Sequence, residues 1–329
     1  MNSGQWHLQP PVELWEDPLV KAYEEIFTFI DFSVLPVPTR GPKRNTLEVY
    51  AKVFLIKVHR KIQYSSDLRK FFFDHPQLIP LVGFCPMYHP VTGAVDVEKT
   101  VVSARHLRRK LHTIENQHLK RLLKHTVDQL HAKHLLKGTA IADTTEILAW
   151  VKENNLKHRV KHRFDKTRTI TGFPQCSLGA KPIPGEKDHK GKPKLRYFWG
   201  AKQAVLVEPT ESGPVFLYED VFTANTADVK TALPTLKPLV ETWAYRLKKF
   251  LADAAYDAFE IYQYVYAKET PEPTRKPATA YIALNSRGHT RLNRQFSEHG
   301  NLICEADLEM INGGRWFDKN KGYHRQKFN

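Results

Sequence analysis

The chain has 329 residues, of which 41% are hydrophobic and 26% are charged. This balance excludes a disordered chain, a collagen and a small disulfide scaffold, and the length allows two or three domains. Lys and Arg number 50 against 35 Asp and Glu, so the formal net charge is +15. A polyanionic partner is expected, with nucleic acid as the first candidate and an anionic membrane surface as the second.

The N-terminal part of the chain is predicted to be helical. Asp17-Pro18 places a capping residue before a proline, and apolar residues follow it at helical spacing to about residue 30. Similar patterns predict helices over residues 46–62 and from residue 65 onward. The longest candidate is a single helix over residues 103–136, with Ser103 as its N-cap.

The pattern changes at residue 139, where short apolar runs predict strands. A polar, basic segment rich in Pro and Gly, over about residues 151–194, is expected to be a loop or an insertion. The remaining elements are predicted in this order: strand 139–143, strand 195–208, strand 214–222, helix 228–246, strand 249–252, helix 258–268 and strand 280–284.

Three consecutive strands followed by alternating helices and strands predict a mixed sheet with helices on its faces. This order resembles that of a ribonuclease H-like α/β core, in which the first and fourth strands lie side by side and parallel. The predicted domains are a helical DNA-binding domain over residues 1–137 and a ribonuclease H-like domain over residues 138–329.

An acid stands at the end of each of these two strands. Asp143 ends the first strand, and Asp253 directly follows the fourth. A single Asp at a strand end is most often a turn or capping residue. Two such carboxylates on adjacent strands repel each other unless a cation lies between them. Hard oxygen ligands favour Mg²⁺ or Mn²⁺, and two such ions can catalyse phosphoryl transfer on a nucleic-acid backbone.

Other acids near these strands have a simpler interpretation. Asp228 and Asp257 are both predicted to be helix N-caps, because each precedes a predicted helix. Glu146, three residues after Asp143, is predicted to be a solvated loop acid.

Five segments, taken in order, resemble the conserved blocks of DDE transposases from bacterial insertion sequences. LADAAYD at 251–257 is similar to the ADxGYD block around the second acid, and IADTT at 141–145 is similar to the first-acid block. RYFWGAK at 196–202 resembles the aromatic-Gly-x-Lys strand between them, and TANTAD at 223–228 resembles the AN-x-x-D segment. Residues 65–84 are similar to the helical N-terminal domain of the family.

The resemblance implies a transposase that binds the terminal inverted repeats of its element. With Mg²⁺ or Mn²⁺ held by Asp143 and Asp253, such an enzyme hydrolyses the strand ends and joins the freed 3′-OH to target DNA, without ATP. It also implies a prokaryotic, cytoplasmic protein associated with the nucleoid, with double-stranded DNA and a second copy of the chain as partners. No apolar run is long enough to span a bilayer, so no membrane association is expected.

Two positions depart from the family pattern. Ala255 stands where the ADxGYD block has Gly. The third acid of the family, a Glu on a helix after a YRCP-like segment, has no counterpart, because residues 323–329 resemble the stretch just before that segment. The chain is therefore expected to be C-terminally truncated and catalytically weak. Its late glutamates, none in a matching context, are Glu298, Glu305 and Glu309.

Two alternatives to the transposase function stay open at this stage. The first is a truncated, non-catalytic DNA-binding remnant, and the second is a ribonuclease H-like nuclease without strand transfer. Residues 101–137 hold nine basic and two acidic side chains, and the cations of this segment either face solvent or lie along DNA phosphates. The candidate DNA-binding residues are Arg105, Arg108, Arg109, Lys120, Arg121 and Lys124.

Overall fold

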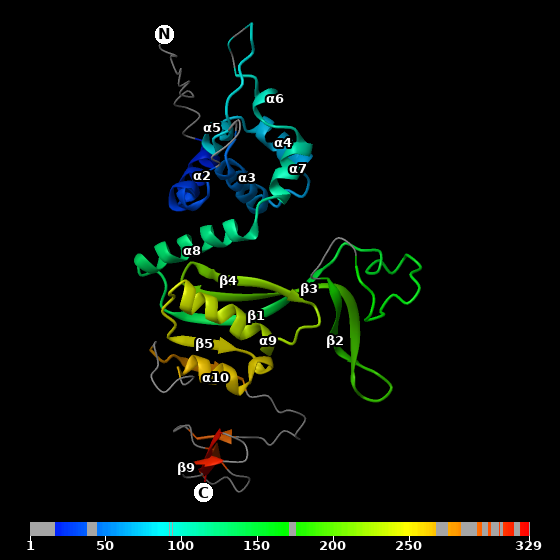
Figure 1. Ribbon diagram of the computed structural model, residues 1–329, viewed down its shortest axis with the longest axis vertical. Coiled ribbons are helices and arrows are strands. Elements are labelled where there is room, and N and C mark those ends of the chain that lie inside the picture. Colours follow the sequence, from blue (N-terminus) through cyan, green and yellow to red (C-terminus); the bar gives the residue numbers. More distant parts are fainter. Residues whose placement is uncertain are drawn as a thin grey trace. The chain divides into compact units, whose positions relative to one another are not determined.

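The computed structural model describes residues 17–37, 45–91, 93, 95–170, 176–267, 276–283, 295–297, 302–303, 309, 312–318 and 323–328. Contacts divide the chain into two compact units, residues 1–282 and residues 283–329, which are considered separately (Figure 1). The domain boundary after residue 137 stays a prediction. Among the described residues, no helix is long and apolar enough to cross a membrane.

The first part of unit 1 is a cluster of helices, as predicted. Asp17 caps the first of them, because its Oδ1 accepts a hydrogen bond of 2.7 Å from the amide of Leu19. The fully buried side chains of Val53, Leu68 and Phe72 belong to the core of this cluster. The helices are α2 (Pro18–Phe29), η1 (Phe32–Val34), α3 (Leu47–His59), α4 (Ser65–Asp74), α5 (Leu78–Val82), α6 (Val97–Thr100), α7 (Ala104–His112) and α8 (Asn116–Ala132).

The single helix predicted over residues 103–136 is wrong, because the chain breaks it into α7 and α8. Ser103 does cap α7, accepting a hydrogen bond of 3.3 Å from the amide of His106. The break falls at Thr113, whose hydroxyl donates to the carbonyl of Lys110 at 3.0 Å. Its amide is shared between the carbonyls of Arg109 and Lys110, the tightened pattern of a helix end.

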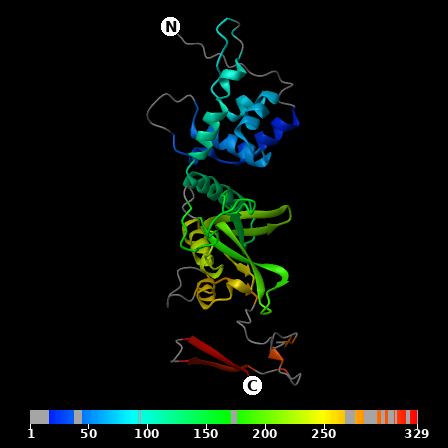
Figure 2. The same ribbon diagram turned by 90° about the vertical axis from the view of Figure 1, so that its right-hand side faces the viewer.

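The second part of unit 1 is built on a six-stranded mixed sheet (Figures 1 and 2). Its strands are β1 (Thr139–Leu148), β2 (Ser177–Lys187), β3 (Pro193–Thr210), β4 (Gly213–Thr223), β5 (Lys249–Ala252) and β6 (Thr279–Ile282). β3 pairs antiparallel with β1 and with β4, whereas β5 pairs parallel with β1 and with β6. Leaving β2 aside, the sheet order is β4-β3-β1-β5-β6.

This strand order confirms the predicted fold class. Numbered by their order in the chain without β2, the strands lie as 3-2-1-4-5, which is the arrangement of a ribonuclease H-like core. The helices α9 (Val229–Lys237) and α10 (Phe259–Val265) flank the sheet, and η3 (Ala254–Tyr256) follows β5. The predicted helix over 228–246 is shorter than expected, because α9 ends in the π-helical turn η2 (Pro238–Thr242).

The core of this part is mostly apolar, and it contains the fully buried carboxylate of Glu208. Phe250 of β5 and Leu206 of β3 are fully buried together with Leu236 of α9. Glu208 is also fully buried, and its Oε1 accepts hydrogen bonds of 2.6–3.1 Å from the amides of residues 137–139. Its Oε2 accepts a hydrogen bond of 2.6 Å from the hydroxyl of Tyr245. Glu208 therefore fixes the start of β1 and has no role at the other end of that strand.

The segment predicted as a loop or insertion contains a strand, β2. Residues 150–170 form turns, as the prediction has it, but β2 then pairs with the first half of β3. Pro182 and Pro184 lie within β2, and its outer half ends in Gly185, Glu186 and Lys187. A proline-bearing edge strand lacks the alternating apolar pattern that would identify it in the sequence.

Unit 2 contains two small antiparallel pairs. β7 (Gln295–Phe296) pairs with β8 (Leu302–Ile303), and β9 (Asn312–Asp318) pairs with β10 (Tyr323–Phe328). Of the late glutamates, Glu309 accepts a hydrogen bond of 2.5 Å from Ser297. Glu298 and Glu305 lie outside the described residues.

A candidate active site beside the end of β5

The two predicted acids occupy matching positions on neighbouring strands. In the parallel pair of β1 and β5, Ile141 lies opposite Leu251, and Asp143 and Asp253 each follow by two residues. Side chains two residues apart point to the same face of a strand, and paired strands lie about 4.8 Å apart. Ala140 and Phe250 are fully buried on the opposite face, which leaves both acids exposed. The register therefore confirms that the two strands are adjacent and in phase.

One detail of the prediction is wrong. Asp143 does not end a strand, because β1 continues to Leu148 through its antiparallel pairing with β3. Asp253 does follow the end of β5, and it also has the simpler role of a cap. Its Oδ1 accepts a hydrogen bond of 2.9 Å from the amide of Ala255 at the start of η3.

Both carboxylates keep one oxygen unused. The Oδ1 of Asp143 accepts a hydrogen bond of 2.7 Å from the amide of Thr144, just as Oδ1 of Asp253 is occupied by a backbone amide. Within the described part of the chain, no hydrogen bond or ion pair reaches the Oδ2 atom of either residue. Two like charges on adjacent strands thus lack a neutralising partner of their own.

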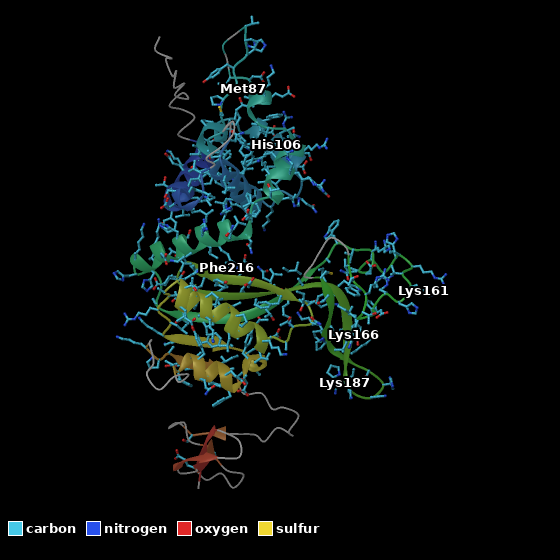
Figure 3. All side chains as sticks on the ribbon, viewed as in Figure 1. Met87, His106, Lys161, Lys166, Lys187 and Phe216 are labelled. Carbon is cyan, nitrogen blue, oxygen red and sulfur yellow. The ribbon has the colours of Figure 1, made fainter. Side chains whose placement is uncertain are left out.

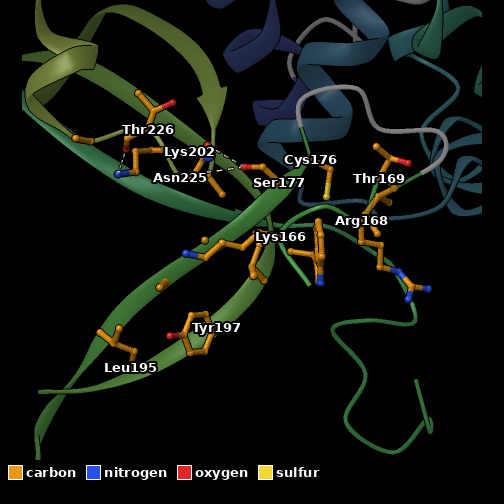
Figure 4. Close-up of a pocket in the computed structure, with 17 residues that line it drawn as sticks. Lys166, Arg168, Thr169, Cys176, Ser177, Leu195, Tyr197, Lys202, Asn225 and Thr226 are labelled. Carbon is orange, nitrogen blue, oxygen red and sulfur yellow. Dashed lines mark hydrogen bonds between the residues drawn. The ribbon is translucent and has the colours of Figure 1, made fainter. Parts of the chain in front are cut away.

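Asp228, predicted to be a helix cap, has a different role. It occupies the N-cap position of α9, but its side chain makes no capping hydrogen bond. Its Oδ1 instead lies 2.6 Å from Nζ of Lys202 on β3 and accepts a hydrogen bond of 2.8 Å from Oγ1 of Thr144 on β1. Lys202 also donates to the carbonyl of Thr226 at 2.6 Å, an interaction drawn in Figure 4.

Tyr256 connects these acids electrostatically. Its side chain is buried, and burial is the main reason why the pKa of its hydroxyl lies well above the ordinary value. Thr231 opposes this rise, whereas the negative charges of Asp228, Asp143 and Asp253 add to it. The contact with Thr231 does not meet hydrogen-bond geometry, so the Tyr256 hydroxyl has no partner among the described residues. All three carboxylates thus lie close enough to act on one buried hydroxyl.

The donor set fits a divalent cation in part. The free Oδ2 atoms of Asp143 and Asp253 are hard oxygen donors of the type that Mg²⁺ and Mn²⁺ prefer, and water would supply the other ligands. Asp228 is not available in the same way, because Lys202 already neutralises it. In the described part of the chain, no group of three or more His, Cys, Asp or Glu side chains is placed to hold a metal ion.

Two neighbouring acids were also assigned wrongly. Glu146 is not a solvated loop acid, because it lies within β1 and pairs with Lys181 of β2 at 3.0 Å and with Arg196 of β3 at 3.1 Å. Asp257 does not cap α10, whose N-cap is Ala258, and its Oδ1 accepts a hydrogen bond of 3.2 Å from the hydroxyl of Tyr262. The sequence pattern of an acid before a helix could not separate these roles.

The structure divides the predicted DNA-binding residues between two helices. Arg105, Arg108 and Arg109 are exposed on α7, and Arg121 is exposed on α8. The two lysines of α8 are already paired. Lys120 lies 3.3 Å from Asp220 and over the ring of Tyr218, and Lys124 lies 2.6 Å from Asp128.

No family model matches this chain, and no curated protein matches it. Solved structures of the Mos1 transposase align with it at low similarity. A paired-end complex with the left transposon end is 14% identical with a TM-score of 0.20, covering 84% of this chain and 68% of that chain. The Mos1 strand transfer complex is 15% identical with a TM-score of 0.22, and the alignment covers 85% of this chain and 69% of that chain. A Mos1 mariner paired-end complex with Mn is 14% identical with a TM-score of 0.20, and the alignment covers 84% of this chain and 70% of that chain. Similarity at this level does not establish a shared fold, so the fold class rests on the strand order itself.

Proposed function

We propose that this chain is a transposase-type enzyme that binds double-stranded DNA and catalyses metal-dependent phosphoryl transfer, with Asp143 and Asp253 as the acids that hold the metal. The observation that carries the proposal is that Asp143 and Asp253 each follow the paired residues Ile141 and Leu251 by two positions and have no cation of their own among the described residues. The chain has 50 Lys and Arg; Asp228 is paired with one of them and Glu146 with two. The unpaired acids are therefore the ones that call for an external cation.

The proposed chemistry has two steps, both in-line displacements at phosphorus. Water attacks a phosphate at the element end, the P–O3′ bond breaks, and a free 3′-OH remains. That 3′-OH then attacks a phosphate of the target strand and displaces its 3′ oxygen. When bound, a divalent ion supplies charge neutralisation at the reacting phosphate. No covalent enzyme intermediate is needed.

The residues of the chain contribute position and charge. The Oδ2 atoms of Asp143 and Asp253 would hold the ion at a fixed place, because their strands are paired just before them. The ion pair of Lys202 and Asp228 connects the segment before α9 to β3. The exposed arginines of α7 are proposed to contact DNA phosphates, with the terminal inverted repeats as the specific sequence.

A nicking assay on supercoiled plasmid DNA tests the proposal. The wild-type chain should nick slowly but measurably in Mg²⁺ or Mn²⁺, because no third acid is placed with Asp143 and Asp253 among the described residues, and it should not nick in excess chelator. Asp143→Asn and Asp253→Asn should each lower the rate by about 100-fold or more, because each removes a ligand of the ion. Asp128→Asn removes a carboxylate on α8 that already pairs with Lys124, so this control should nick at the wild-type rate.

The other outcomes separate the alternatives. Salt-dependent binding of DNA without metal-dependent nicking would contradict catalysis and support a non-catalytic DNA-binding protein. Nicking that never leads to joined products with a second DNA would instead support a ribonuclease H-like nuclease. Equal nicking by Asp143→Asn and the wild type would contradict the assigned site.

A further inference from the structure

A two-stranded ribbon extends from the sheet at its β2 edge. β3 pairs with β1 only from Gly200 onward and with β4 only from Ala201 onward. Residues 193–199 of β3 therefore have β2 as their single partner strand among the described residues. This ribbon, β2 together with residues 193–200 of β3, is called the arm, and Figure 1 shows it projecting from the sheet. An isolated pair of strands is marginally stable in water, so its length is not explained by its own stability.

The arm is poorly suited to bind a protein strand or an apolar surface. Pro182, Pro184 and Pro193 lack the amide hydrogen that an added strand would need. The larger apolar side chains of its outer part are Ile183, Leu195 and Tyr197; Ile183 is half-buried, and Tyr197 already packs against Phe164 with ring centroids 5.7 Å apart. Its turn, residues 187–192, contains no apolar residue that could enter a membrane.

The acids in and around the arm are already engaged. Glu153 lies 2.7 Å from Arg168, and Glu186 lies 2.8 Å from Lys194. At the turn, Oδ1 of Asp188 accepts hydrogen bonds of 2.9 Å from the amides of Lys190 and Lys192. These acids fix local geometry, so they leave the other cations of the region unneutralised.

Many cations of the arm and of the preceding loop, residues 150–170, make no ion pair within the described residues. Three of them, Lys161, Lys166 and Lys187, are labelled in Figure 3, where they lie on the loop and the arm. The turn holds Gly191 at φ +74, and it carries lysines on both of its sides. The cations without an ion pair among the described residues are Lys152, Lys157, Arg159, Lys161, Arg163, Lys166, Lys187, Lys190 and Lys192, of which Arg163 donates hydrogen bonds to backbone carbonyls.

The space between the loop and the arm is open and basic. A cavity of about 710 Å³ lies there, lined by Lys166, Arg168, Tyr197 and Asn225 among others (Figure 4). Lys202, the partner of Asp228, also lines this cavity. The lining of the cavity therefore reaches the segment before α9, where Asp228 lies.

We propose that the arm and the loop over residues 150–170 form a second DNA-binding surface, which contacts the phosphates of duplex DNA beside the active site. The inference rests on the proposed function, because that function identifies DNA as the polyanion. A two-stranded ribbon fits the major groove of duplex DNA, and lysines at its turn reach the phosphates on the groove edges. The surface adds affinity and orientation and carries no requirement for a base sequence.

The test compares two triple variants of the full chain that lose the same charge. K187Q/K190Q/K192Q removes the lysines of the turn, and K230Q/K248Q/K249Q removes three exposed lysines of the same sheet-containing part. Affinity for a 30-base-pair duplex is measured over a range of salt concentrations, and circular dichroism confirms that both variants fold. K187R/K190R/K192R keeps the charge and serves as the rescue variant.

For the arm variant, the slope of log affinity against log salt should become shallower by about 2 to 3, since each lost phosphate contact contributes about 0.9. The control variant and the arginine variant should keep the wild-type slope. Equal slopes for the arm and control variants would overturn the inference and leave the proposed function standing. A wild-type slope near zero would overturn both. Competition by phosphatidylserine vesicles that is stronger than competition by duplex DNA would assign the surface to a membrane and also overturn the inference.

Discussion

Tyr256 is the most unusual single residue beside the candidate site, because its buried hydroxyl has no hydrogen-bond partner among the described residues. Three carboxylates act on it, and burial together with their charges raises the pKa of the hydroxyl. The hydroxyl of Tyr245, by contrast, has a hydrogen-bond partner, because it donates to Oε2 of the buried Glu208 at 2.6 Å. These two tyrosines form a natural pair of sites for mutation.

Tyr256→Phe is expected to leave the free energy of unfolding at pH 8 unchanged or to raise it by about 1 kcal/mol, because it removes an unsatisfied polar group. Tyr245→Phe should lower it by about 2 kcal/mol, because Oε2 of the buried Glu208 loses the hydrogen bond that the Tyr245 hydroxyl donates. Urea unfolding of both variants measures the difference. If Tyr256→Phe lowered the free energy of unfolding as much as Tyr245→Phe, the Tyr256 hydroxyl would have a hydrogen-bond partner, which would contradict this interpretation.

The raised pKa of Tyr256 also predicts a dependence on pH. In the unfolded chain the hydroxyl loses its proton near its ordinary pKa of about 10, whereas in the folded chain it stays protonated to higher pH. Below about pH 10 this hydroxyl therefore adds no pH dependence to the free energy of unfolding. As the pH rises further, ionisation of the hydroxyl in the unfolded chain lowers that free energy. Between pH 9 and pH 11, the free energy of unfolding should fall by less in Tyr256→Phe than in the wild type. An equal loss would contradict this assignment.

The positions of Asp143 and Asp253 could be predicted from sequence because each follows a short apolar run, and strand order then makes the runs adjacent. The role of Asp228 could not be predicted in this way. An Asp before a helix has the same local pattern whether it caps the helix or pairs with a distant lysine, and Lys202 is 26 residues earlier in the chain. Long-range ion pairs leave no local signal, as the misassigned Glu146 also shows.

Among the elements, β3 connects the sheet to the arm, and Gly200 lies at the junction. Gly200 is opposite Leu148 on one side and Ser177 on the other, so both of its neighbours are strands. A Cβ atom at this position would lie 2.1 Å from the carbonyl oxygen of Ile147. A backbone atom held in a paired strand cannot move away as a side chain can.

Gly200→Ala is therefore expected to lower the free energy of unfolding by about 3 kcal/mol. Gly185→Ala is the matched control, because Gly185 has φ +77 but its Cβ would meet nothing within 4 Å. Backbone strain alone should make this control cost about 1–2 kcal/mol. Similar losses in the two variants, measured by urea unfolding, would show that β1 and β3 separate easily at this point.

The division of one predicted helix into α7 and α8 changes which cations can reach DNA. R105Q/R108Q/R109Q on α7 should make the salt dependence of DNA binding shallower by about 2 to 3. K120Q/R121Q/K124Q on α8 should change the slope by about 1, because Asp220 and Asp128 already neutralise its two lysines. Binding isotherms at several salt concentrations test both variants. A larger effect from α8 would show that DNA displaces these pairs.

At the scale of elements, sequence patterns predicted most of the sheet and missed the parts without apolar periodicity. β1, β3, β4 and β5 carry buried apolar residues, β6 carries the partly buried Ala280 and Ile282, and all five strands were expected. β2 was missed because two prolines, two glycines and four polar residues interrupt any alternating apolar pattern in it. The break at Thr113 was missed because the apolar spacing continues across it. Periodicity reports burial, and neither feature changes the burial pattern of its segment.

For the whole molecule, the net charge of +15 favours binding of a polyanion such as DNA, and the unpaired carboxylates restrict where that polyanion can bind. A basic protein attracts a polyanion, but two exposed acids on adjacent strands repel that polyanion unless a cation neutralises them. In a ribonuclease H-like sheet, that cation would allow a phosphate to approach the acids. The central claim is therefore that Asp143 and Asp253 bind one divalent ion together.

Titration with Mn²⁺, followed by the electron paramagnetic resonance signal of the free ion, tests this claim directly and needs no DNA. The wild-type chain and the control Asp128→Asn should bind Mn²⁺ equally. Asp143→Asn and Asp253→Asn should each weaken binding by at least about tenfold, and the double variant should be little weaker than either single variant, because the two acids share one ion. Wild-type affinity in both single variants would contradict the account.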